Sequence, residues 1–103
     1  MNVEGRRFAV WGAARSGVAA ANLIVDLGGR VTLSDRRSAD ELDLSSLRRG
    51  VEFVGGGNIL ADADVLVPSP GIRPSNEALN AAVQSGVTLM SEVELAASVA
   101  KAP

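Results

Sequence analysis

Short apolar runs alternate with helix-like stretches along the chain, and this alternation restricts the fold more than any single residue does. Strands are predicted for residues 7–11, 30–34, 51–54, 64–67 and 87–90. Helices are predicted for residues 16–27, 75–85 and about 91–100, with weaker candidates at 39–49 and 58–63. Repeated strand–helix–strand units favour parallel pairing with right-handed crossovers. We therefore predict an α/β fold: a doubly wound, five-stranded parallel sheet in the order 3-2-1-4-5, with helices on both faces.

Composition narrows the available chemistry. The chain has 103 residues, enough for one domain but short for an enzyme that holds two substrates. It contains no cysteine and no histidine, which removes disulfides, thiol nucleophiles, imidazole bases and ordinary zinc sites. The net charge of -2 argues against general nucleic-acid binding. We expect no catalytic residue and no metal site, and either a small binding module or a piece of a larger protein.

The sequence carries no pattern for export or for membrane insertion. Two arginines precede a short apolar run near the N-terminus, but a signal peptide needs a longer apolar region and a cleavage site. No stretch approaches the roughly 20 apolar residues that span a bilayer. We therefore expect a cytoplasmic protein that does not bind membranes.

The segment after the first strand has the outline of a phosphate-binding loop. Gly12, Ala14 and Gly17 occupy the three positions of G-x-G-x-x-G, and the loop leads into a helix. Backbone N–H groups at a helix N-terminus can hold a pyrophosphate without any side chain. Alanine at the second position adds a methyl group where the backbone comes closest to phosphate, which favours a ligand placed differently from a dinucleotide. The alternative is that these small residues only let the helix pack closely on the sheet.

Charged residues follow the second strand. Asp35 lies close to the roughly 20-residue spacing at which an acid bonds a ribose hydroxyl in dinucleotide-binding domains. Arg36 and Arg37 beside it favour an additional phosphate or a different nucleotide. The alternatives are a turn or helix-capping role for the aspartate and ordinary solvated surface charges for the arginines.

The segment after the fourth strand is a proline-rich turn. Two prolines flank Ser69 and Gly71 follows, which predicts a rigid turn that presents backbone donors and the serine hydroxyl. The alternative is a connector stiffened for stability. Parallel sheets bind ligands beyond the carboxyl ends of their strands, at the point where the strand order reverses, so this turn is a candidate for function.

Two glutamates near the C-terminus could be mistaken for a catalytic pair. Ser91 and Glu94 fit a capping box, however, and an acid at Glu92 is favoured in the first turn of any helix. We therefore interpret both glutamates as part of a helix start.

Together these segments resemble the N-terminal domain of the Mur ligases, in particular the members that add D-glutamate. That family carries a G-x-G-x-S/T-G loop, a D-x-R after the second strand, an S-P-G-I turn and a G/S-E-I/V-E-L helix start. The matching segments are Gly12 to Gly17, Asp35 to Arg37, Ser69 to Ile72 and Ser91 to Leu95. The resemblance covers essentially the whole chain and implies a Rossmann-like fold.

The resemblance also implies a ligand and a role for each segment. In such ligases the N-terminal domain binds the UDP end of UDP-N-acetylmuramoyl-L-alanine. Arg15 and Ser16 would offer backbone N–H groups to the diphosphate, Asp35 and Arg36 would edge the uracil, Arg37 would lie close to the nucleotide, and Gly71 would flank it. The predicted UDP-binding residues are therefore Gly12, Ala14, Arg15, Ser16, Gly17, Asp35, Arg36, Arg37, Ser69 and Gly71.

The rest of the implied reaction belongs to parts of the ligase outside residues 1–103. A central domain would bind ATP through a phosphate loop that this chain lacks, and Mg²⁺ and D-glutamate would also bind there or in a C-terminal domain. The full-length protein would be an ADP-forming amide ligase of peptidoglycan synthesis, and we expect a monomer whose isolated N-terminal domain is inactive. Two other interpretations stay open: an NAD(P)-binding domain of an oxidoreductase, and a Rossmann-type ligand-sensing regulator.

Overall fold

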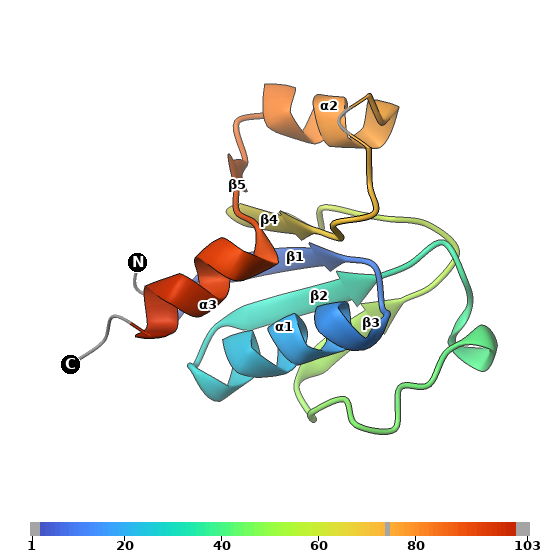
Figure 1. Cartoon of the computed structure of the whole chain (residues 1–103), viewed down its shortest axis with the longest axis vertical. Coiled ribbons are helices and arrows are strands. Elements are labelled where there is room, and N and C mark those ends of the chain that lie inside the picture. Colours follow the sequence, from blue (N-terminus) through green and yellow to red (C-terminus); the bar gives the residue numbers. More distant parts are fainter. Residues whose placement is uncertain (1–2, 74, 101–103) are drawn as a thin grey trace.

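The structure, a computed structural model, describes residues 3–73 and 75–100. One parallel sheet runs through it in the order β3-β2-β1-β4-β5, as predicted (Figure 1). Its strands are β1 (Arg7–Trp11), β2 (Arg30–Ser34), β3 (Val51–Val54), β4 (Val65–Pro68) and β5 (Thr88–Leu89). The helices are α1 (Arg15–Asp26), α2 (Glu77–Gln84) and α3 (Glu92–Ala100), with a short 3-10 turn, η1 (Ala39–Glu41).

The two faces of the sheet are covered by different helices, which confirms the predicted doubly wound, Rossmann-like architecture. Alternate residues of a strand point to opposite faces. Phe8 and Val10 of β1 belong to a core cluster shared with α1 and with Leu95 of α3. Ala9 and Trp11 belong to a second cluster that includes buried residues of α2. The switch in crossover direction therefore falls between β1 and β4, the pair of neighbours that is not sequential in the chain.

The helix predicted for residues 39–49 is not present. Only η1 forms, and Ser38 and Glu41 close it with a reciprocal capping box. Beyond it, the side chain of Asn22 on α1 accepts a hydrogen bond from the Arg48 backbone N–H and donates one to the Ser46 carbonyl. The leucines of this segment pack on the first core cluster without helical spacing. Tertiary contacts with α1 thus hold the segment as a loop.

The helix predicted for residues 58–63 is also absent. Ala61 and Asp62 have φ angles of 48° and 60°, in the left-handed region, where an L-residue helix does not continue. The segment is held instead by side chains of the sheet. The Trp11 Nε1–H donates to the Ile59 carbonyl at 2.8 Å, and the Ile59 N–H donates to the Ser34 hydroxyl at 3.1 Å. The connection from β3 to β4 is therefore an extended loop rather than a helix.

The remaining predictions differ only at the ends of elements. Pro68 closes β4 in register with Trp11, one residue later than predicted, because the last residue of a strand tolerates a missing N–H. The strand predicted for residues 87–90 is reduced to the two exposed residues of β5 at the sheet edge. Gly86 has a φ of 95° and ends the segment after α2 as predicted. Among the residues described, no helix is long and apolar enough to cross a membrane.

Candidate functional site at the carboxyl edge of the sheet

The three segments singled out in the sequence come together at the carboxyl edge of the sheet. The Gly12 N–H donates to the Ser34 carbonyl at 2.8 Å, which joins the glycine loop to the end of β2. A Cβ on Gly12 would lie 2.8 Å from the Ser69 Cβ, so the proline-rich turn packs directly against the same loop. The strands that precede these segments are β1 and β4, which flank the switch point, and β2, which lies next to β1.

Two glycines of the loop are required by close backbone approach. Gly12 has a φ of 99°, in the left-handed region that favours glycine. A Cβ on Gly17 would lie 1.7 Å from the Gly12 carbonyl oxygen, a distance that excludes any side chain. Ala14 has an extended backbone with φ of −75°, and its side chain is exposed. The alanine at the middle position therefore causes no backbone strain, and its methyl group is exposed to solvent.

The N-terminus of α1 is left without a cap, unlike those of the other two helices. Ala14 is its N-cap residue, no side chain caps it and no acid lies in its first turn. By contrast, Asn76 caps α2 by accepting from the Leu79 N–H, and Ser91 shares a capping box with Glu94 at α3. The first N–H groups of a helix have no intrahelical partner, and they lie at the positive end of its dipole. The exposed start of α1 is thus suited to hold an anion.

Asp35 joins the glycine loop to the segment after β2. Its Oδ2 accepts the Ala13 N–H at 2.7 Å, and its Oδ1 accepts the Arg37 N–H at 2.8 Å. The Arg37 guanidinium donates to both carboxylate oxygens at 3.0 Å. The hydrogen bonds from the Arg37 side chain, supported by the two backbone N–H groups and opposed by partial burial, lower the pKa of Asp35 to about 2. Both oxygens are engaged inside the protein, which weakens the expectation that this acid binds a ribose hydroxyl.

The two arginines differ in what holds them. Arg37 is bonded through Nε and Nη2 to Asp35, so its guanidinium plane is fixed while half of its side chain remains exposed. Arg36 is exposed, and the described part of the chain offers its side chain no hydrogen bond or ion pair. Both arginines line a hollow of about 440 Å³ together with Asp35 and Glu41. A second hollow, of about 400 Å³, extends from Arg37 along the start of α1, where Ala14 and Arg15 line it.

Two hydrogen bonds to Ser69 close the proline-rich turn. The Ile72 N–H donates to the Ser69 carbonyl at 3.0 Å across Pro70, and the Gly71 N–H donates to the Ser69 hydroxyl at 3.3 Å. The hydroxyl hydrogen of Ser69 keeps its capacity to donate to a ligand. Gly71 is exposed at the tip of the turn.

Three residues of the site were missed in the sequence. Ala13 contributes the N–H that fixes Asp35, the buried Ser34 ties the edge loops together, and Glu41 lines both hollows. A polar residue at the end of a buried strand was the one available signal, and it pointed to Ser34. Across residues 3–73 and 75–100, no group of acidic side chains is arranged to hold a metal ion.

Comparison with known families identifies the family of this chain. The family model described as Mur ligase MurD-like, N-terminal domain, matches residues 6–91, which include the glycine loop, the aspartate–arginine segment and the proline-rich turn. The chain belongs to the MurD-like Mur ligases. Relatives named UDP-N-acetylmuramoylalanine–D-glutamate ligase are 44% identical in Anaeromyxobacter dehalogenans, over 92% of this chain, and 40% identical in Syntrophotalea carbinolica, over 97%. This MurD-like domain spans 22% and 23% of the lengths of those two relatives.

A solved structure shares the fold of this MurD-like domain. The apo-structure of D-lactate dehydrogenase from Escherichia coli superposes with a TM-score of 0.59 and 27% identity, over 88% of this chain and 29% of that one. The likeness is to one part of a protein named for different chemistry, so it supports the Rossmann-like sheet rather than a reaction.

Proposed function

We propose that this domain binds the UDP moiety of UDP-N-acetylmuramoyl-L-alanine as part of a ligase that adds D-glutamate in peptidoglycan precursor synthesis. Membership of the MurD-like family and the names of the relatives support this proposal. The observation that carries it is the uncapped start of α1, which meets the Asp35–Arg37 pair and the Ser69–Gly71 turn at one edge. That arrangement combines an anion cradle with a fixed guanidinium plane.

Each part of the site has a role in this proposal. The backbone N–H groups of Arg15 and Ser16 hold the diphosphate at the start of α1. Arg37, held by Asp35, presents a planar cation beside the base, an arrangement that favours stacking with an aromatic ring. Arg36 lies at the edge of the uracil. Ser69 and Gly71 border the nucleotide on the far side of the glycine loop.

The chemical step lies outside these residues in the proposed ligase. The full-length protein would use ATP and Mg²⁺ to activate the substrate carboxylate as an acyl phosphate, which the D-glutamate amine then attacks. This domain holds one end of that substrate and contributes no reacting group. We propose that it is inactive alone, and that the ligase is a cytoplasmic monomer.

A second candidate is a dinucleotide-binding domain of an oxidoreductase, favoured by the structural likeness to D-lactate dehydrogenase. The engaged Asp35 weighs against it, because both carboxylate oxygens already accept bonds from Ala13 and Arg37. The alanine at position 14 also adds a methyl group where a dinucleotide pyrophosphate comes closest.

Titration of the ¹⁵N-labelled chain with UDP, with UDP-N-acetylmuramoyl-L-alanine and with NADH distinguishes the two candidates. We expect both uridine ligands to shift the amide signals of Ser16, Asp35 and Gly71 in a saturable manner, with NADH causing little change. Shifts of the same amides by NADH and not by the uridine ligands would assign the site to a dinucleotide instead.

A further inference from the structure

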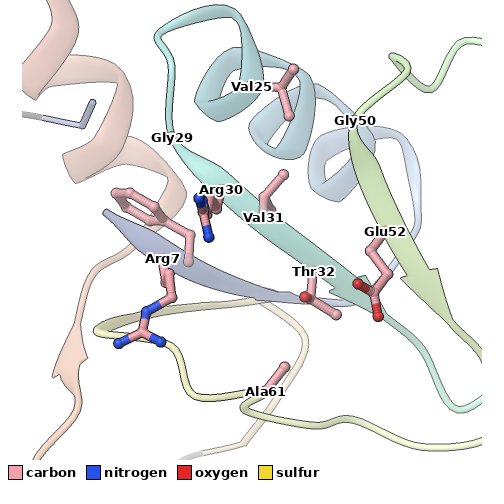
Figure 2. A pocket seen from close by; sticks show the side chains of 10 residues that line it. Arg7, Val25, Gly29, Arg30, Val31, Thr32, Gly50, Glu52 and Ala61 are labelled. Carbon is pink, nitrogen blue, oxygen red and sulfur yellow. The ribbon is translucent and has the colours of Figure 1, made fainter. Parts of the chain in front are cut away.

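A second pocket lies at the opposite, amino edge of the sheet. This pocket has a volume of about 360 Å³, and Ala61 of the loop at residues 58–63 bounds it on one side of the sheet (Figure 2). Val25 of α1 lines it on the other side. This volume lies within the range of small-molecule sites, roughly 300–1,000 Å³.

Two arginines lie at one end of this pocket. Arg7 and Arg30 are partners in the register of β1 and β2, so both side chains start from the same face of the sheet. Like charges on directly opposed strand positions destabilise a sheet. The positive charge of Arg7 is partly compensated by Asp64, whose Oδ2 lies 3.8 Å from the Arg7 Nε. Arg30 has no ion pair within the described residues. Gly50, which directly precedes β3, also lines the pocket and has no side chain to fill the space.

A carboxylate lies at the other end of the pocket. Glu52 is the register partner of Thr32, and Figure 2 shows its carboxylate on the side of the Thr32 side chain, with both arginines toward the far end. Strand spacing puts the Cα atoms of Arg30 and Glu52 roughly 8 Å apart, one strand across and two residues along. Glu52 forms no ion pair with Arg30 in the structure. The pocket thus keeps separated positive and negative ends with a hydroxyl between them.

We propose that this pocket binds a small zwitterion that carries a carboxylate and an ammonium group, of amino-acid or dipeptide size. The carboxylate would lie between the guanidinium groups of Arg7 and Arg30, which relieves their mutual repulsion. The ammonium group would lie against Glu52, and Thr32 would bond the polar atoms in between. A simple anion would meet the repulsion of Glu52, and a simple cation that of the arginines, so the charge pattern favours a ligand with both charges.

Titration of the ¹⁵N-labelled chain at constant ionic strength tests this proposal, with glycylglycine as the zwitterion, acetate as the anion and methylammonium as the cation. We expect glycylglycine to shift the amides of Arg30, Thr32 and Glu52 in a saturable manner. Acetate and methylammonium should bind at least about tenfold more weakly, because each leaves one charged end of the pocket unpaired. Equal affinity for acetate and glycylglycine, or no saturable shift by glycylglycine, would overturn the proposal.

Substitutions test whether glycylglycine binds at this pocket. Arg30→Gln and Glu52→Gln should each weaken glycylglycine binding about tenfold, through loss of one charge-assisted contact. Arg49→Gln is the matched control, since Arg49 is an exposed arginine next to β3 that does not line the pocket. A well-dispersed amide spectrum confirms that each variant is folded.

The shifts caused by UDP at the carboxyl edge should be the same in all three variants, so the outcome at this pocket is independent of the proposed function. If Arg49→Gln weakens glycylglycine binding as much as Arg30→Gln, the binding is general charge attraction and the pocket is excluded.

Discussion

At the scale of single residues, Asp35 does more than its position after β2 indicated. Its carboxylate joins the Ala13 N–H of the glycine loop to the guanidinium and backbone of Arg37. Only 7% of the Asp35 side chain is exposed, but half of the Arg37 side chain is, so solvent partly screens the charge-assisted bonds between them. Asp35 therefore positions two parts of the candidate site at once.

This role predicts a pH-dependent contribution to stability. The folded pKa of Asp35, about 2, lies below its ordinary value of 3.8, so the folded state favours the ionised form. The stabilisation is nearly complete above about pH 5 and is lost as the pH falls through 3.8 toward 2. We expect Asp35→Asn to lower the free energy of unfolding by about 2 kcal/mol at pH 7, and this difference to shrink below pH 4. Urea unfolding of both proteins between pH 2 and pH 7 measures it, and a difference independent of pH would contradict the assignment.

At the scale of elements, the start of α1 is the least satisfied of the three helix starts. Asn76 and Ser91 supply caps at α2 and α3, whereas Ala14 supplies none. A good cap stabilises a helix by about 1 kcal/mol. The chain lacks this stabilisation at the helix whose first N–H groups form the proposed diphosphate site.

We therefore expect that a capping residue at position 14 raises the stability of the domain and lowers its affinity for UDP. Ala14→Asp should raise the free energy of unfolding by about 0.5–1 kcal/mol, because the new carboxylate caps α1 and interacts favourably with its dipole. The same substitution should weaken UDP binding at least about tenfold, since the carboxylate occupies the anion cradle and repels the diphosphate. Asn76→Ala is the matched control: it should lose about 1 kcal/mol of stability and leave UDP affinity unchanged. Denaturation and UDP titration of both variants check this, and unchanged UDP affinity in Ala14→Asp would exclude the start of α1 as the diphosphate site.

At the scale of the whole molecule, both core clusters depend on the same central strands. Phe8 and Val10 of β1 face one cluster, while Ala9 and Trp11 of the same strand face the other. Loss of β1 would expose both clusters, so we expect one cooperative unfolding transition.

Trp11 is the only tryptophan in the chain and is buried against α2, which makes its fluorescence a probe of that face. Urea transitions followed by Trp11 fluorescence and by far-ultraviolet circular dichroism should coincide, with a slope of about 1–3 kcal/mol/M. Separate midpoints would mean that the two faces unfold independently.

The parts of the fold that followed from sequence are those with local physical causes. The strands β1 to β3 carry short apolar runs, and the start of α3 carries a reciprocal cap at Ser91 and Glu94, so neighbouring residues alone specify them. The strand order is that of the doubly wound arrangement predicted from the alternating segments. The positions of the glycine loop and the two other edge segments followed in turn from that order.

Long-range contacts decided the rest. The segments at 39–49 and 58–63 form loops because Asn22 of α1, and Trp11 and Ser34 of the sheet, bond their backbones from far along the chain. No local pattern encodes such partners. The same holds for Asp35, which the sequence offered as a ligand for ribose and the fold turned inward to Ala13 and Arg37. The sequence alone determined the sheet and its order, and it predicted which edge would carry the binding site. Only the tertiary structure decided which polar groups at that edge remain free, because a group's availability depends on the partners that folding brings to it.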